Sequence, residues 1–588
     1  MGVHIAPTFA PTFEILFDMA NLKLPCCGLF GGLLGYLFQS NTVPDNAPSS
    51  PHYRPPLLTN WRPYTSPLVQ PEVIDMRGGG HLDMYVGEVL HAWGSGAPSG
   101  TVYGFGREGS APSFPGPTIL TARNVPISVT WTNRLGTAPH LLHRNTEPSF
   151  LVEASACYPT CGVPTSVHIH GLENPPKYDG MPTQTFYHNT TFKAKYANRQ
   201  FPSTKVYHDH AWGLSQLNMW AGMVGLYAVQ DAELESKFHL DKLPDMAFIL
   251  QDKLISADGA LLYTEKLTCS PVAPTKWVPQ AYGSVNTVNG VVMPFATIDA
   301  SRVRFRWANV ANARTYTLTL PFAHLCKVVA TDGGFVHRPS PVPVTDWTLF
   351  PLERVEMVCD FTSVPAGTTF DIVDKPLLQE TAYVYDARVM QVQITPSQGA
   401  REKQRQVSRR HPLPDTLVAL KSMRQLHVDT LGMTRQVTLG ELMDGHGCST
   451  HLYLQEHSAI KDATTIKSTL HCTLGKVEKW EFINPTVGPH PFHWHLVNAQ
   501  CGETEATINT NELKDVVVIP ARPDGGVALV CYVACTPDEF LAVHSTRSAH
   551  SFGFNVLDDP YLAHCHIMEH GENQMMAWFQ LTAKDVDN

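Results

Sequence analysis

The sequence predicts an all-β protein built from a triplicated domain, on three observations. The 588 residues include 46 prolines and 41 glycines, which favours many turns and short strands over long helices. Apolar and polar residues alternate with a period of two in segments such as 125–131, as in a strand with one buried face. Three such strands end in aromatic-x-Asn, at Trp131-Thr-Asn133, Trp307-Ala-Asn309 and Phe482-Ile-Asn484, at intervals of 176 and 175 residues. Chance repetition of short strings is the alternative interpretation.

The chain length sets an expectation of two to four domains. Residues 398–414, QGAREKQRQVSRRHPLP, are charged and poor in apolar residues, as in an exposed linker between the second and third repeats. The first boundary is expected within residues 230–242, where the helix-prone DAELESKFHL follows an apolar strand. We therefore predict an apolar segment and extended arm (1–70), three β-domains (71–235, 236–397 and 421–588) and a linker (398–420).

Charge and hydropathy exclude some partners and indicate a compartment. The net charge of −10 argues against nucleic acid, because its binders carry a basic face that neutralises phosphates. The apolar run at residues 24–38 is shorter than the roughly 20 residues of a membrane-spanning helix, so we expect no spanning segment. It resembles a secretory signal if translation begins at Met19, because Glu14 and Asp18 otherwise replace the basic start of a signal. We expect a secreted or extracellular protein, with the sequon at Asn189 in agreement and a cytoplasmic location as the alternative.

The cysteines do not form a zinc ribbon. Cys157/Cys161 and Cys531/Cys535 are too few and too far apart for such a site, although local disulfides are compatible with them. The 13 cysteines are an odd number, which leaves at least one without an intramolecular disulfide partner. That cysteine is either a free thiol or a metal thiolate.

Histidines occur in four closely spaced groups. Successive side chains of a strand point to opposite faces, so His-x-His places both imidazoles on one face about 7 Å apart, close enough to serve neighbouring metals. A single pair is more often a surface or core pair than a ligand set, but four together indicate metal binding. The groups are His168-Ile-His170, His208-Asp-His210, His490-Pro-Phe-His493-Trp-His495 and His564-Cys565-His566.

The last group connects two kinds of site. Alternation sends His564 and His566 to one face of the strand and Cys565 to the other. A thiolate, two imidazoles and a weak thioether form the ligand set of a blue copper centre. Eight histidines remain for other coppers, and the peptide between Cys565 and its neighbours gives electrons a short covalent route. The blue copper ligands would be Cys565, His570, Met575 and the distant His490.

In order and in register, these four segments resemble the signature segments of the multicopper oxidases, over roughly residues 72–582. The resemblance implies three cupredoxin-like (plastocyanin-like) Greek-key β-barrel domains, with the type 1 copper in the third, and four copper ions in all. Its type 1 ligands would be His490, Cys565, His570 and Met575, and its type 2 pair His168 and His493. The two type 3 ions would be held by His170, His208, His210, His495, His564 and His566.

Within the family, the chain is most similar to the bacterial spore-coat laccase and phenoxazinone synthase branch. Segments such as Phe114-Pro-Gly-Pro-Thr-Ile119, Val288-Asn-Gly290 and Thr331-Asp-Gly-Gly334 carry this similarity, and Leu496 replaces the usual glycine after the third motif as it does in that branch. Bilirubin oxidases are near neighbours, but many of them have tryptophan where this chain has Gly488.

Four protons must accompany four electrons to dioxygen, so carboxylates are expected near the cluster. Asp179 matches an acidic residue of the branch near the trinuclear centre, although an Asp-Gly turn is the alternative interpretation. The branch's other acid directly follows the second type 1 histidine; Gly571 stands there, and a role for Glu572 stays open. The predicted catalytic residues are therefore Asp179, His564, Cys565 and His566.

The resemblance implies a laccase-like enzyme that couples one-electron oxidation of a small reductant to reduction of O2 to water. A weak thioether ligand, Met575, favours a lower to middle type 1 potential and easily oxidised phenols, aminophenols or aromatic amines. A metallo-oxidase for Cu(I) or Fe(II) is the alternative, although the 17 methionines form no Met-rich insertion. Bilirubin oxidase and a catalytically dead copper protein are further alternatives, and we expect a monomer.

Overall fold

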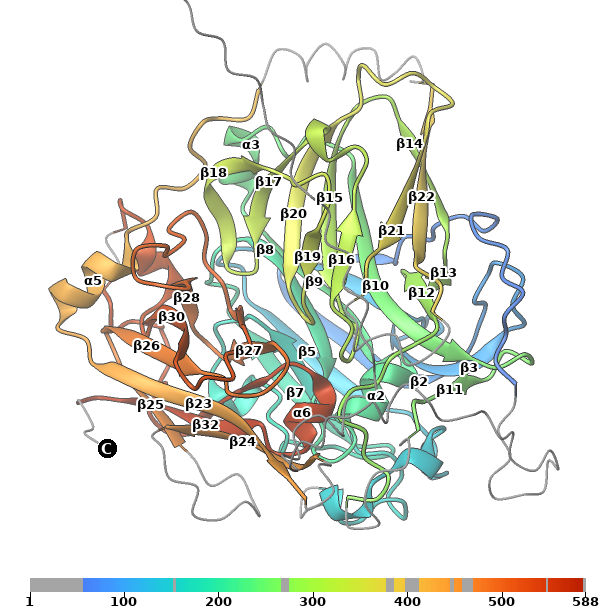
Figure 1. Cartoon of the computed structure of the whole chain (residues 1–588), viewed down its shortest axis with the longest axis horizontal. Helices are drawn as coiled ribbons and strands as arrows, with labels where there is room; N and C mark the ends of the chain where they lie inside the picture. Colours follow the sequence, from blue (N-terminus) through green and yellow to red (C-terminus); the bar gives the residue numbers. More distant parts are fainter. Residues whose placement is uncertain are drawn as a thin grey trace, which may run out of the picture. The chain divides into compact units, whose positions relative to one another are not determined.

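The computed structural model describes residues 56–151, 155–265, 274–376, 385–396, 412–444, 449–456, 469–545 and 548–584. Within these residues the chain is mainly β-strand, arranged in six sheets, which confirms the all-β prediction (Figure 1). The apolar run at 24–38 and residues 398–411 of the predicted linker lie outside the described residues. The sheets form three successive pairs along the chain.

The first sheet pair combines a sheet of order β3-β2-β5-β7 with one of order β1-β4-β9-β8-β6. Buried side chains such as Trp131, Phe105 and Tyr207 fill the space between them. The strands are β1 (Val73–Asp75), β2 (Gly80–His91), β3 (Gly100–Arg107), β4 (Gly116–Ala122), β5 (Ile127–Asn133), β6 (Val167–His170), β7 (Thr191–Tyr196), β8 (Ser203–Asp209) and β9 (Val224–Gln230).

The second sheet pair combines β13-β12-β10-β15-β20-β17-β18, with β11 paired to β10, and β14-β22-β21-β16-β19. Its core contains Phe305, Trp307 and Phe361. The strands are β10 (Asp245–Ile255), β11 (Leu261–Leu262), β12 (Val285–Val288), β13 (Val291–Val292), β14 (Phe295–Asp299), β15 (Arg302–Asn309), β16 (Tyr316–Thr319), β17 (Cys326–Thr331), β18 (Gly334–Pro341), β19 (Trp347–Leu349), β20 (Arg354–Asp360), β21 (Thr369–Asp374) and β22 (Arg388–Thr395).

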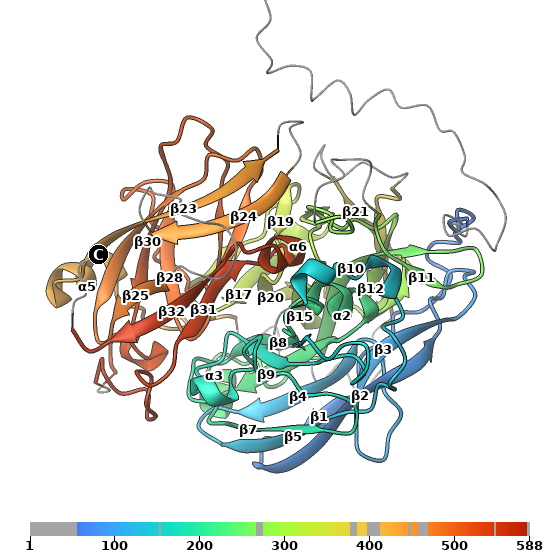
Figure 2. The ribbon, with the colours of Figure 1, turned by 90° about the horizontal axis from the view of Figure 1, so that it is seen from below.

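The third sheet pair combines β24-β23-β26-β30-β28 and β25-β32-β31-β27-β29, drawn in orange and red in Figure 2. Trp480, Phe482 and Trp494 pack in its core. The strands are β23 (Thr434–Met443), β24 (Ser449–Glu456), β25 (Thr469–Thr473), β26 (Val477–Ile483), β27 (His490–Trp494), β28 (Asn498–Gly502), β29 (Val516–Ile519), β30 (Val527–Ala534), β31 (Tyr561–Cys565) and β32 (Met576–Thr582).

The helices in the described residues are short: α2 (Ser215–Ala221), α3 (Ala232–Lys237), α5 (Met423–Thr430) and α6 (Met568–Glu572). Helix α3 lies within the predicted helix-prone segment, and the carboxylate of Asp231 caps it by accepting from the backbone N–H groups of Glu233 and Leu234. None of the helices in the described part of the chain combines the length and apolar character needed to cross a bilayer.

The aromatic-x-Asn repeat has a structural cause. Strand β5 lies parallel to β2, β15 to β10 and β26 to β23, so the repeat occupies the same place in each sheet pair. In every case the asparagine side chain accepts from the backbone N–H two residues later and donates to backbone carbonyls of other segments. The donated bonds from Asn133, Asn309 and Asn484 reach Val163, Leu349 and Ile519 at 2.8, 2.9 and 3.1 Å. The repeat therefore has a structural role: in each sheet pair the asparagine side chain stabilises the turn that follows the strand, so the repeat is not chance.

Asn309→Ala should lower the free energy of unfolding by about 1–3 kcal/mol, because it removes the side-chain acceptor of the Ala311 N–H and the side-chain donor to the carbonyls of Arg314 and Leu349. Urea unfolding of the copper-free protein followed by fluorescence would measure the loss. The copper spectrum of the folded variant should be unchanged, because Asn309 contacts no predicted ligand. A variant as stable as wild type would contradict this role.

Four disulfides lie in the described residues, and two of them differ from the local pairs that the sequence allows. Cys157 bonds to Cys161, as spacing allows, but Cys531 bonds to Cys501 on the neighbouring strand β28. Cys535 bonds to Cys472, and Cys326 to Cys359 across β17 and β20. Among the described cysteines, Cys565 alone has no disulfide partner.

Candidate metal centre

One cluster of predicted ligands lies where one end of the β27–β31 ladder in the third sheet pair meets helix α6. His490 begins β27, Cys565 ends β31, and these strands pair antiparallel. His570 lies in α6, and all three side chains are buried. The Sγ of Cys565 lies 3.6 Å from the Nδ1 of His490 and 3.6 Å from the Nδ1 of His570. The two Nδ1 atoms are 3.2 Å apart, so two imidazole nitrogens and a thiol converge on one point.

The fourth predicted ligand of this cluster is held by backbone bonds. The N–H of Met575 donates to the carbonyl of His570, and the carbonyl of Met575 accepts from the N–H of Cys565, both at 3.0 Å. Its side chain is completely buried in the same core as Cys565. The outer nitrogen of His490, Nε2, lies 2.8 Å from the hydroxyl of Thr486.

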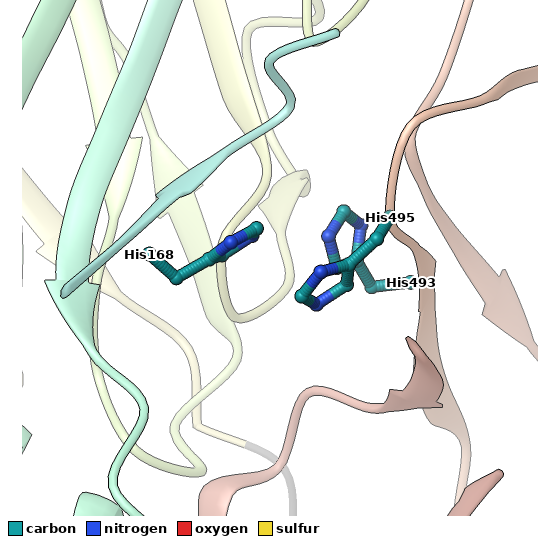
Figure 3. Close-up of side chains that lie close together, drawn as sticks. All are labelled: His168, His493 and His495. Atoms are coloured by element: carbon teal, nitrogen blue, oxygen red, sulfur yellow. The ribbon is translucent and has the colours of Figure 1, made fainter. Parts of the chain in front are cut away.

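The other eight histidines form a second cluster between the first and third sheet pairs. Strands β6 and β8 pair with His168 opposite His208, and β27 and β31 pair with His493 opposite His564. Figure 3 shows His168 pointing from its strand toward His493 and His495. The remaining members are His170, His210 and His566, and all eight side chains are buried.

The cluster divides into groups that could each hold an ion. The donor nitrogens of His210, His495 and His564 lie within 4.8 Å of one another, as do those of His168, His493 and His495. The rings of His170, His208 and His566 lie 5.0–6.0 Å apart between centroids. His564 and His566 both face this cluster while Cys565 faces the other one, as the alternation predicts.

The hydrogen bonds of the rings fit a metal. Four histidines use Nδ1 to bond to a carbonyl or carboxylate: His168 to the Asp179 carbonyl (2.6 Å), His208 to the Asp209 carbonyl (2.9 Å), His493 to the Asp515 carbonyl (2.8 Å) and His495 to the Asp179 carboxylate (2.6 Å). The Nε2 atoms of these rings are buried and have no hydrogen-bond partner. Buried polar atoms are rarely left unpaired, so these nitrogens fit the donor atoms of a metal site.

Electrostatics supports the same conclusion. Burial and the neighbouring imidazoles hold the pKa of His168, His210, His493, His495 and His566 well below the usual value. Neutral imidazole is the form that binds a metal ion. Two clusters thus lie on opposite faces of β31, one with thiol and imidazole donors and one with imidazoles alone, and this division of donors fits copper.

Comparison with known proteins identifies the family. Two family models described as multicopper oxidase match residues 160–234 and 450–585, and these ranges contain all twelve predicted ligands. The chain belongs to the multicopper oxidase family. As a multicopper oxidase, it binds copper and is an oxidoreductase that uses O2 as electron acceptor.

Relatives of this multicopper oxidase align with about four fifths of the chain. A rice protein, multicopper oxidase LPR1 homolog 1, is 28% identical over 526 residues, or 82% of this chain and 84% of the relative. A laccase of Bacillus stratosphericus is 29% identical over 492 residues, or 79% of this chain and 88% of the relative.

Solved structures support the fold of three cupredoxin-like domains. The McoA multicopper oxidase of Aquifex aeolicus has a TM-score of 0.64 at 19% identity, covering 88% of this chain and 99% of that one. A multicopper oxidase of Campylobacter jejuni, titled a metallo-oxidase, has a TM-score of 0.62 at 17% identity, covering 90% and 98%.

Asp179 contacts two of the predicted copper ligands of the multicopper oxidase. Its backbone carbonyl faces Nδ1 of His168 and its Oδ2 faces Nδ1 of His495, while its Oδ1 is buried with no hydrogen-bond partner. Burial raises the pKa of Asp179 well above its usual range. The Asp179-Gly180 turn is present, with Gly180 at φ 73°, so the turn interpretation is correct but incomplete.

Glu572 has a structural partner in this multicopper oxidase. One carboxylate oxygen accepts from the backbone N–H of Gly213 at 2.6 Å. The other accepts from the N–H of Ser215 at 2.9 Å and from its hydroxyl. Both oxygens are therefore occupied at the N-terminus of α2, where a carboxylate is a favourable cap.

Glu572→Gln should lower the apparent free energy of unfolding of the copper-free protein by about 1–3 kcal/mol, because the amide nitrogen cannot accept from the α2 donors. Thermal unfolding followed by circular dichroism would check this, with Glu539→Gln as a control on a less buried carboxylate. If the stability is unchanged but dioxygen consumption slows, Glu572 serves the cluster and not the helix.

Three residues near the ligands escaped the sequence prediction. Asp515 and Arg354 lie outside the histidine motifs, and only the fold brings Asp515 to His170 and Arg354 to Asp515. Glu569 directly precedes the predicted ligand His570, and this neighbouring position is the sequence feature that could have indicated it. Its carboxylate accepts from the hydroxyl of Tyr263 at 2.7 Å and from the side chain of Asn312 at 2.9 Å, which connects helix α6 to the second sheet pair.

Proposed function

We propose that the chain binds four copper ions. His490, Cys565, His570 and Met575 would hold the type 1 ion, and His168 with His493 the type 2 ion. The six remaining histidines separate into two trios for the type 3 pair: His210, His495 and His564, whose donor atoms are mutually close, and His170, His208 and His566, whose rings are neighbours. The observation that carries this proposal is the set of buried, unpartnered ring nitrogens facing a common space.

Bound copper would supply one-electron transfer and the reduction of dioxygen to water. The protein supplies the connection between the two clusters, because Cys565 is joined by single peptide links to His564 and His566 on the other face of β31. It also excludes water, since every one of the twelve predicted ligands is buried. Asp179 fixes the ring orientations of His168 and His495 and places a carboxyl oxygen beside them for proton delivery.

The proposed reductants are small phenols, aminophenols and aromatic amines. The type 1 histidines are only 2% (His490) and 5% (His570) exposed, so a reductant approaches the ring edges without binding to the metal. The outer nitrogen of His490 contacts the half-buried Thr486. The adjacent Val487 is 86% exposed, so the surface beside His490, where a reductant would approach, has an apolar side chain. The similarity to the laccase of Bacillus stratosphericus agrees with this class.

A metallo-oxidase for Cu(I) or Fe(II) is the second candidate, because one structural neighbour carries that description. An organic reductant is favoured by the apolar Val487 at the entry and by the lack of any Met-rich insertion in the sequence.

Oxygen uptake with a diphenol, an aminophenol, bilirubin, Cu(I) and Fe(II), each over a concentration series, tests the substrate class. We expect the diphenol and the aminophenol to give the highest kcat/KM. A higher kcat/KM with Fe(II) or Cu(I), together with negligible uptake with the organic reductants, would replace the laccase-like proposal by a metallo-oxidase.

We further propose that the protein is a secreted monomer. The four disulfides among the described residues favour an oxidising compartment, and the sequon at Asn189 is exposed. N-terminal sequencing of the mature protein and its sedimentation velocity test both points. An intact N-terminus with retention in the cytoplasm would favour the cytoplasmic alternative.

A further inference from the structure

His170 is oriented differently from its neighbours in the eight-histidine cluster. Its Nε2 lies 3.1 Å from Oδ1 of Asp515, and its Nδ1 is buried without a hydrogen-bond partner. In His168, His208, His493 and His495 the outward nitrogen is Nδ1 and the unpartnered one is Nε2. The His170 ring therefore presents the opposite nitrogen to the cluster.

The carboxylate that binds His170 is itself held by a residue of the second sheet pair. Arg354, the first residue of β20, donates from Nη1 and Nη2 to the two oxygens of Asp515 at 2.7 and 2.6 Å. The guanidinium and the carboxylate are both buried, and the ammonium of Lys205 lies 3.8 Å from Asp515. A two-point Arg–carboxylate pair fixes direction as well as distance, so Asp515 has little freedom to release or rotate the imidazole.

The backbone beside His170 leaves room for this pair. A Cβ at Gly171 would contact Oδ2 of Asp515 and would lie 2.9 Å from Nη2 of Arg354 and 3.0 Å from Cδ of Lys205. Gly171 also has φ 85°, a conformation that favours glycine. The glycine that follows the His-x-His motif thus serves the close approach of the Arg354–Asp515 pair.

We propose that Arg354 and Asp515 are positioning residues that fix the His170 ring with Nδ1 toward a type 3 copper. The inference rests on the proposed copper assignment. The second sheet pair supplies none of the twelve predicted ligands, but through Arg354 it would help to position one of them. Arg354 begins β20, Asp515 directly precedes β29, and the ligand His170 ends β6. Second-sphere hydrogen bonds of this kind set both the orientation and the basicity of a metal-bound imidazole.

Three variants test the pair. Asp515→Leu keeps the branched shape but removes both oxygens. Asp515→Asn keeps an acceptor for His170 but weakens the Arg354 contact, and Gly171→Ala displaces the carboxylate without changing any charge. Copper-free protein would be titrated with copper against a competing chelator, following the type 3 absorption in the near ultraviolet and the blue type 1 band separately. We expect type 3 affinity to fall about 10–100-fold in Asp515→Leu and Gly171→Ala, and less in Asp515→Asn, with type 1 binding retained.

Glu356→Gln is the matched control. Glu356 is a buried carboxylate that accepts from Arg304 at 2.9 Å, from Arg306 at 2.8 Å and from Thr204 at 2.6 Å, yet it contacts no predicted ligand. It should lower thermal stability as the Asp515 variants do, while type 3 affinity stays at the wild-type value. Equal loss of type 3 affinity in Glu356→Gln and Asp515→Leu would reduce Asp515 to a general stabilising residue and overturn the proposal.

A crystal structure of the copper-loaded wild type, with anomalous scattering at the copper edge, tests the copper assignment and the positioning role separately. Copper at the cluster with His170 bound through Nδ1 supports both the assignment and the positioning role. Copper bound through Nε2 of His170 overturns the positioning role alone. No copper at the eight histidines overturns the proposed function, and the inference with it.

Discussion

Replacing Cys565 by serine is expected to abolish the blue colour and the oxidase activity together. The thiol is the only sulfur among the three donors that converge within 3.6 Å, and a serine hydroxyl cannot give the strong thiolate bond to copper that causes the colour. It also stands between the two clusters, since His564 and His566 are its immediate neighbours in sequence. The effect should be a loss of steady-state oxygen uptake to background with every organic reductant.

The visible spectrum, EPR and copper content of the same Cys565→Ser preparation separate this loss from misfolding. The eight histidines keep their partners in the variant, so the type 2 signal and the type 3 absorption should remain. A blue variant would show that Cys565 is not the thiolate ligand of the type 1 copper. A colourless variant with wild-type turnover would show that electrons enter the cluster without Cys565.

Asp179→Asn is expected to slow reoxidation of the reduced enzyme by dioxygen by about 100-fold or more, which is the range of general acid–base contributions. The amide keeps the shape of the side chain and can still bond to His495, but it cannot deliver a proton. Reduction of the type 1 site under anaerobic conditions should keep its wild-type rate, because Asp179 lies at the other cluster. Stopped-flow mixing of the reduced protein with dioxygen measures the first rate and anaerobic mixing with a diphenol the second.

Gly180 provides a control for Asp179, because it belongs to the same turn. Gly180→Ala would strain that turn at φ 73° and bring a Cβ against the backbone of Val167, without removing the carboxyl group. Similar losses in both variants would assign the effect to turn geometry. Wild-type dioxygen kinetics in Asp179→Asn would remove the carboxyl group from proton delivery.

Much of the site could be predicted from sequence because each ligand group is local. His-x-His spacing on a strand determines which side chains share a face, and the alternation at His564, Cys565 and His566 is realised in the structure as expected. The three aromatic-x-Asn strands likewise share a local hydrogen bond, in which the asparagine side chain accepts from the N–H two residues later. Where chemistry depends on neighbours within a few residues, the pattern alone is informative.

The rest depends on contacts between distant segments. Nothing local distinguishes Glu572 as a cap of α2, since its donors are more than 350 residues away in sequence. Cys531 and Cys535 are close in sequence, but the strand register gives them different disulfide partners, Cys501 and Cys472. The proposed division of six histidines into two trios depends on how the sheet pairs meet. The same is true of the hydrogen bonds from Arg354 to Asp515, beside His170.

The copper content and the EPR spin count of one copper-loaded preparation test the central claim most directly. The account predicts four copper ions per chain, a blue type 1 signal and a type 2 signal in equal amounts, and a type 3 pair that is EPR-silent because its spins are coupled. A colourless preparation, or one in which every bound copper is visible by EPR with a single kind of signal, would contradict it.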